Sequence, residues 1–282
     1  MKKLVCLLLL AICLPALAQD KKHNWEIAYE HSKYTYKEPH MANPIKDYGH
    51  KNGVSIKYLQ RSVLTPGDVT DSDHSFAALD FRYMSGDVTY KGWLKNLDTG
   101  EVTPNSESGI KDYYFEASLK IGAVYRLADP LDIWPYLGLG WRQLRNHSEK
   151  GIGGYQRTST YIYLPLGTNL RCKVSDTVSF TLNGQFDVLL HGNQYSRMSD
   201  VWDGDDSSNR QNQGYGIRAS VRGDVNLGKV GLFIEPFWRY WHIQNSNEEW
   251  FYEGGDPTKP VLSLVEPFNT TSEWGIRAGI TF

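Results

Sequence analysis

The last ten residues, 273–282, constrain the fold of this chain more than any other stretch. Every second side chain is apolar, and these side chains share one face: Trp274, Ile276, Ala278, Ile280 and Phe282. Strict alternation with a period of two predicts a β-strand with one apolar face. A soluble domain rarely ends by exposing such a stripe. A closed transmembrane β-barrel needs a last strand that pairs with the first and faces lipid.

The first 18 residues have the features of a secretory signal peptide. Lys2 and Lys3 supply positive charge, and residues 4–13 form an apolar run that is too short to span a membrane. Residues 16–18 are Ala-Leu-Ala, a cleavage site of the Ala-x-Ala type. We therefore expect residues 1–18 to be removed and residues 19–282 to form the mature domain.

Ten segments of the mature chain show the same alternation of apolar and polar side chains. They cover approximately residues 25–34, 53–61, 76–84, 113–125, 134–144, 160–173, 178–191, 214–226, 230–243 and 273–282. In the fourth segment, Tyr113 and Tyr125 bracket aliphatic residues centred near Leu119, the distribution expected across a bilayer. The pattern predicts an all-β fold, a ten-stranded antiparallel transmembrane β-barrel with up-and-down topology. Twelve strands is the alternative count.

The predicted connections alternate between long and short. A polar loop is expected to reach Gly49, and another to cover residues 87–110. Residues 65–68 (Thr-Pro-Gly-Asp) and residues 227–229 (Leu-Gly-Lys) predict tight turns. Outer-membrane barrels have long extracellular loops and short periplasmic turns, so this alternation indicates the same topology.

These features together resemble bacterial outer-membrane β-barrel proteins, whose last strand typically ends in Phe and is read by the assembly machinery. The resemblance implies a place in the bacterial outer membrane, with periplasmic N- and C-termini. It implies outer-membrane lipid, lipopolysaccharide and the barrel-assembly machinery as partners, and Trp274, Ile280 and Phe282 as the assembly signal. A soluble β-sandwich or lipocalin-like barrel explains the alternation but not an apolar stripe on every strand.

Composition agrees with this interpretation. Aromatic residues make up 13% of the chain, with 18 Tyr and 9 Trp, and such residues gather at the two interfaces of membrane barrels. The formal net charge is −2, and loss of the two signal-peptide lysines makes it more negative, so nucleic acid is not an expected partner. Cys172 remains alone in the mature chain and cannot form an internal disulfide.

The inward faces of the predicted strands carry many charges of both signs. Ionic groups removed from water need partners, and a ten-stranded barrel is narrower than a porin. We therefore expect a salt-bridge network that fills the lumen, in preference to a selective channel lining. The predicted network contains Glu30, Lys57, Asp80, Arg82, Glu116, Lys120, Arg142, Asp187, Arg218, Arg222, Glu235, Arg239 and Arg277.

A barrel of ten strands also resembles the omptin outer-membrane proteases in size. That family uses an Asp pair and an Asp–His pair at the extracellular rim. Neither pair is found at matching strand ends here. Asp187 and His191 are expected to share an inward face, but their spacing departs from the omptin motif, so we interpret them as a hydrogen-bonded lumen pair. The nearby Ser196 is too generic to indicate a lipid-modifying enzyme.

Two loops carry residue patterns that could form a binding site, one for a calcium ion and one for a surface partner or lipopolysaccharide. Asp203, Asp205, Ser207 and Asn209 alternate as calcium ligands could, but Ser208 replaces the expected Gly and the distal Glu is absent. This departure predicts a solvated acidic loop and no metal site. Residues 250–252 (Trp-Phe-Tyr) predict either an adhesive patch or contact with lipopolysaccharide at the membrane rim.

The sequence therefore predicts a non-enzymatic outer-membrane barrel that presents loops to the outside, without a cofactor. Its expected role is structural or surface-interacting, and no extracellular ligand can be identified. A small-solute channel is the alternative function. An omptin-like or lipid-modifying enzyme is the third hypothesis, for which catalytic geometry has to be shown.

Overall fold

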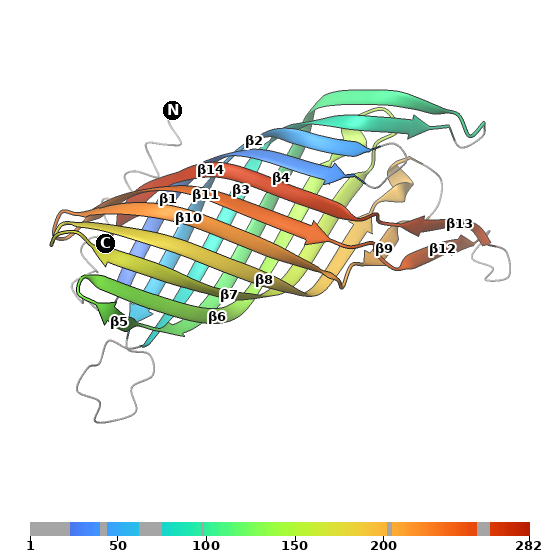
Figure 1. The fold of residues 1–282 in the computed structure, drawn as a ribbon. Helices are drawn as coiled ribbons and strands as arrows, with labels where there is room; N and C mark the ends of the chain where they lie inside the picture. The colour runs from blue at the N-terminus through green and yellow to red at the C-terminus, as the bar shows by residue number, and fades with distance from the viewer. Residues whose placement is uncertain (1–22, 40–43, 62–74, 97–98, 202–204, 253–259) are drawn as a thin grey trace.

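The computed structural model describes residues 23–39, 44–61, 75–96, 99–201, 205–252 and 260–282. The expected signal peptide, the expected turn at residues 65–68 and Asp203 lie outside these residues. Most of the described chain is β-strand (Figure 1). Within the described residues, no helix is long and apolar enough to cross a membrane.

Ten of the described strands close into one antiparallel barrel, which confirms the predicted fold (Figure 1). Each strand pairs with the next along the chain, and the last, β14, pairs with β1. The barrel strands are β1 (His23–Glu38), β2 (Ile45–Arg61), β3 (Ser75–Lys95), β4 (Val102–Ala123), β6 (Leu131–His147), β7 (Gln156–Lys173), β8 (Val178–Ser196), β10 (Gly214–Asn226), β11 (Gly231–Ile243) and β14 (Asn269–Thr281).

The remaining described elements are short. Strand β5 (Tyr125–Ala128) pairs with β6, and β9 (Ser207–Arg210) pairs with the end of β8. Strands β12 (Glu248–Tyr252) and β13 (Pro260–Val265) form a separate hairpin, and two 3₁₀ turns cover Ser148–Lys150 and Met198–Asp200. These pieces extend the barrel wall and add no further strand to its closed circumference.

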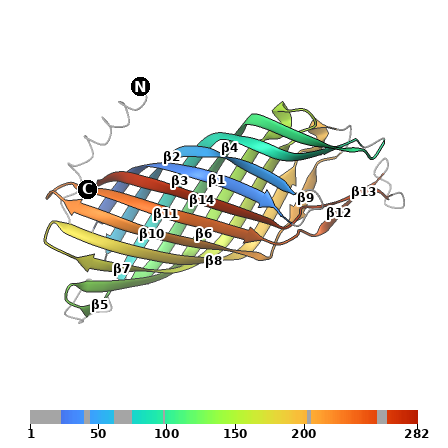
Figure 2. The same ribbon diagram turned by 45° about the horizontal axis from the view of Figure 1, so that its top comes forward.

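The barrel has two dissimilar ends. One end holds the C-terminus and the turns that follow β7 and β10, and we call it the terminal end. At the opposite end, the loop end, the β3–β4 and β12–β13 hairpins project beyond the wall (Figures 1 and 2). Polar loops were expected up to residue 49 and over residues 87–110, and this expectation was wrong. Most of those residues belong to the extended strands β1 to β4.

A continuous ring of exposed apolar side chains, the apolar belt, surrounds the barrel. Each of the ten barrel strands contributes to it, because apolar side chains point outward at alternate positions. Members of the belt, one from each strand, are Tyr29, Ile56, Leu79, Leu119, Leu139, Leu166, Leu182, Val221, Ile234 and Ile276. Exposed apolar surface on every strand is the property expected of a barrel wall that faces lipid.

The C-terminal residue joins the two ends of the sheet. The backbone amides of Trp25 and Phe282 each donate to the carbonyl of the other residue, at 2.8 and 2.9 Å. Trp274 is 62% exposed on the outer face, as expected, but Phe282 is only 7% exposed. The expectation that Phe282 faces lipid was therefore wrong. Its ring is buried and, with Thr281, borders the cavity inside the barrel.

The belt gives a test of the strand register. Leu119 is 53% exposed on β4, whereas Lys120 points inward to Asp80. We expect Leu119→Arg to lower the free energy of unfolding in lipid vesicles by about 2–4 kcal/mol, because it places a charge on the lipid face. Val102→Arg, on the same strand near the loop end, is the matched control and should change it by less than about 0.5 kcal/mol. Equal effects of the two substitutions contradict this assignment of the belt.

Candidate functional site: the ion-paired lumen

The middle of the lumen is crossed by a network of ion pairs to which eight barrel strands each contribute one charged residue. We call this set the mid-lumen network. Its members are Glu30, Arg82, Glu116, Arg142, Asp187, Arg218, Arg239 and Glu273. Four carboxylates face four guanidinium groups, so the network is neutral as a whole. Neutral pairing is what makes burial of ionic groups tolerable.

Glu30 and Glu116 are the two centres of the mid-lumen network. Arg82 Nε donates to both carboxylate oxygens of Glu30 at 3.0 Å, and Arg239 Nη2 donates to Oε2 of the same residue at 2.7 Å. Arg82 also lies 3.4 Å from Glu116, which joins the two centres. The Glu30 side chain is fully buried, so its charge depends on these partners.

Glu116 connects opposite walls of the barrel. It forms an ion pair with Arg218, whose Nε donates to Asp187 at 2.6 Å. The Tyr163 hydroxyl donates to Glu116 at 2.6 Å. Glu116 lies on β4 and Arg218 on β10, and these strands are four places apart in a ring of ten. The Glu116–Arg218 pair therefore reaches across the lumen between non-adjacent strands.

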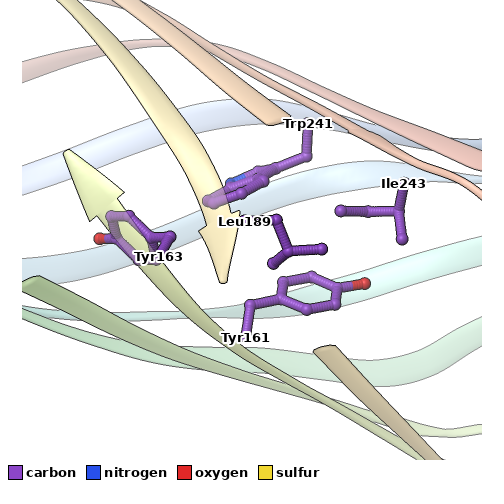
Figure 3. Packing of buried hydrophobic residues seen from close by; sticks show 5 residues of the cluster. All are labelled: Tyr161, Tyr163, Leu189, Trp241 and Ile243. Atoms are coloured by element: carbon purple, nitrogen blue, oxygen red, sulfur yellow. The ribbon is translucent and has the colours of Figure 1, made fainter. Parts of the chain in front are cut away.

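Apolar side chains pack on the loop side of this pair. Tyr161 and Tyr163 from β7, Leu189 from β8, and Trp241 and Ile243 from β11 form one buried cluster (Figure 3). The rings of Tyr163 and Trp241 are 5.2 Å apart with an edge-to-face geometry. Such packing excludes water and strengthens nearby ion pairs, because the local dielectric constant is lowered. Ionic and apolar contacts therefore lie side by side in this part of the interior.

Toward the terminal end, the charged residues line space instead of filling it. Lys57, Asp80, Lys120, Arg222, Glu235 and Arg277 border a cavity of about 1150 Å³. Arg277 binds Glu235 at 2.5 Å and Glu26 at 3.0 Å, and Lys120 binds Asp80 at 3.2 Å. Lys57 has no ion pair within the described residues. Asp80, Lys120, Arg222, Glu235 and Arg277 form ion pairs while they line this space.

A third set of buried charges lies toward the loop end, and sequence analysis missed it. Lys51 forms an ion pair with Asp112 and lies 3.6 Å from the centre of the Tyr34 ring. Arg157 binds Glu38 at 3.3 Å and also pairs with Glu266. Alternation continues through these stretches, but both faces of the strands are polar beyond the belt. The apolar signal that defines a membrane strand is consequently absent there.

Carboxylates outnumber cations in this loop-end cluster. Asp47, Glu38 and Glu266 lie near Arg157, and all three are buried beyond the apolar belt. Burial raises the pKa of Asp47 to about 7, although Arg157 opposes the shift. Burial also raises the pKa of Glu266 above its usual range. The cluster therefore favours protonation of at least one acid when the protein is folded.

The structure separates Asp187 from His191. Tyr163 pairs with Leu189, and the adjacent Ile162 pairs with His191, so a β-bulge at Leu190 shifts the alternation by one residue. His191 consequently points outward and is exposed, whereas Asp187 stays inside and binds Arg218. The expected inward Asp–His pair was wrong.

The predicted solvated acidic loop is partly strand. Ser207 and Asn209 lie on β9 and are fully buried. Asn209 Nδ2 donates to the carbonyls of Asn247 and Leu264, at 3.1 and 2.9 Å. These bonds hold β9 against the segments that carry Asn247 and Leu264. Trp250, on β12, is 46% exposed.

Comparison with known proteins identifies the fold. No family model matches the chain, and no curated protein matches its sequence. The outer membrane protease OmpT from Escherichia coli is similar in structure, with a TM-score of 0.59 and 10% identity over 94% of this chain and 97% of that one. The toluene transporter TodX from Pseudomonas putida has a TM-score of 0.31 and 10% identity over 93% of this chain and 89% of that one. The similarity to OmpT confirms the expected outer-membrane β-barrel fold.

The loop-end cluster predicts a specific pH dependence. Because the pKa of Asp47 is raised to about 7 on folding, the folded protein keeps a proton that the unfolded chain releases above about pH 4. The contribution of Asp47 to the free energy of unfolding should therefore fall between about pH 4 and about pH 7, by at most about 1.4 kcal/mol per pH unit. Asp47→Asn should remove this loss, and urea titrations in vesicles at several pH values measure it.

The matched control is Asp87→Asn, which replaces an exposed acid on the outer side of β3. Its stability should follow the wild-type pH profile. Asp47→Asn should gain stability relative to wild type as pH rises through the window, and the difference should then stay constant. Parallel profiles for wild type and Asp47→Asn contradict the role given to Asp47.

Proposed function

We propose that this protein is a non-enzymatic outer-membrane barrel with a closed lumen, which presents its loop end for interactions at the cell surface. In this proposal the loop end faces outward and both termini are periplasmic. Outer-membrane lipid contacts the apolar belt, and lipopolysaccharide contacts its outer rim. Trp274, Ile280 and Phe282 belong to the strand that the barrel-assembly machinery reads.

The observation that carries the proposal is the Glu116–Arg218 pair across the lumen. A solute path needs continuous space, but this pair and its neighbours occupy the cross-section between opposite walls. Removing either partner alone would leave the buried network with an excess charge, because Glu116 and Arg218 are also paired with other members of it, and such an imbalance is unfavourable. The pair is therefore a stable closure and not a weak surface contact that thermal motion opens.

The hairpins at the loop end support a role in surface interaction. β3 and β4 remain paired far beyond the apolar belt, out to Lys95 and Val102. Regular backbone hydrogen bonds hold this hairpin in one conformation, so a partner that binds it meets a preorganised surface. The β12–β13 hairpin adds the exposed ring of Trp250, a residue type that is enriched at binding hot spots.

Planar-bilayer recording tests the closed lumen. We expect no steady conductance from the wild-type protein, because the mid-lumen network blocks the passage. The double substitution Glu116→Ala and Arg218→Ala removes the closing pair without changing net charge, and should produce ion-conducting openings. The matched control is Asp80→Ala with Lys120→Ala, a pair that borders the existing cavity, and it should remain silent. Stable wild-type openings would favour the small-solute channel instead.

A further inference from the structure

The cavity below the mid-lumen network has the form of a binding pocket. Its volume is about 1150 Å³, and ligand pockets are typically about 300–1,000 Å³. Glu116, Arg218 and Arg239 border it on the side of the network. Asp176 and Lys229, from the turns after β7 and β10, border it at the terminal end. The cavity therefore opens at the terminal end and stops at the mid-lumen network.

One wall of the cavity carries an aromatic surface formed by Phe76, Trp134 and Tyr136, which we call the aromatic shelf. The rings of Phe76 and Trp134 are 5.5 Å apart. The Arg61 guanidinium lies 4.9 Å from the centre of the Trp134 ring. Flat apolar groups stack favourably on such a surface, and a cation beside it attracts anions.

Two buried donors on this wall lack an acceptor among the described residues. Trp134 is only 7% exposed, and its indole Nε1–H has no hydrogen-bond partner. The same holds for Nε of Arg171, whose Nη2 donates to Ser179 at 3.3 Å. Buried donors without acceptors are uncommon and unfavourable, so both groups suit a ligand that brings acceptor oxygens.

The pairing of β6 and β7 brings these donors together. Trp134 pairs with Asn169, so Arg171 is its diagonal neighbour on the same inward face. Asp132 lies opposite Arg171 in the register, but its carboxylate is held by Arg126 at 3.4 Å and Lys173 at 3.9 Å. Arg171 forms no ion pair with a described residue, and a guanidinium of this kind matches the geometry of a carboxylate.

We propose that this cavity binds an aromatic carboxylate that enters from the terminal end. The ring of the ligand lies against the part of the aromatic shelf that borders the cavity, and its carboxylate accepts hydrogen bonds from Trp134 Nε1 and Arg171 Nε. Lys57, which also borders the cavity, adds positive charge. A free aromatic acid and the C-terminal phenylalanine of a peptide share this chemistry. The site is independent of the surface role proposed above.

Calorimetric titration of the protein in nanodiscs with 3-phenylpropionate tests the proposal, with empty nanodiscs as the blank. We expect a Kd on the order of 0.1–1 mM, the range for a small ligand held by one charge-assisted contact and a stacked ring. The neutral amide, 3-phenylpropanamide, should bind at least about tenfold more weakly, because it lacks the charge that Arg171 recognises. Acetylglycylphenylalanine is the second probe, and tighter binding of it identifies a peptide as the source.

Variants locate the site. Arg171→Met should weaken binding by at least about tenfold, and Trp134→Phe, which keeps a ring but removes the N–H, by about threefold or more. Arg197→Met, at the loop end, should bind as wild type does. Heat-modifiable migration in gels verifies that each variant is folded. Absence of wild-type binding to both probes, or unchanged binding by folded Arg171→Met and Trp134→Phe, overturns the proposal.

Discussion

The middle of this barrel depends on charges being neutralised by partners on other strands. A wall that faces lipid with one face of each strand turns the other face inward, and here that inward face carries carboxylates and guanidinium groups. In the mid-lumen network the two signs are equal in number, and Glu116 reaches Arg218 from nearly the opposite wall. The ion pairs therefore connect distant parts of the sheet.

The three levels of the interior differ in physical character. The loop-end cluster has excess acid, so its charge depends on pH. The mid-lumen network is neutral, and is packed against Tyr163 and Trp241. The terminal end is hollow, and its wall combines aromatic rings with donors that lack protein acceptors. The cavity at the terminal end is bordered by members of the mid-lumen network, and the loop-end cluster lies beyond them.

The features that a bilayer requires of a barrel wall could be predicted from the sequence. Outward apolar residues such as Leu119 identified all ten strands, because lipid requires an apolar side chain at every second position. The ends of the strands beyond the belt could not be predicted from the sequence, because Asp47 and Glu38 lie there among other polar residues. His191 was also misplaced, because a one-residue bulge leaves no trace in the hydrophobic pattern. Whether charges such as Glu235 fill or line the lumen depends on side-chain reach across the barrel, which alternation does not encode.

Glu116 and Arg218 couple nearly opposite walls of the barrel, and a double-mutant cycle measures this coupling directly. The cycle compares the free energies of unfolding in vesicles of wild type, Glu116→Gln, Arg218→Met and the double variant. The structure predicts a coupling energy of about 1–3 kcal/mol, since the two groups are buried and in contact. Additive effects within about 0.5 kcal/mol would contradict a cross-lumen closure by this pair.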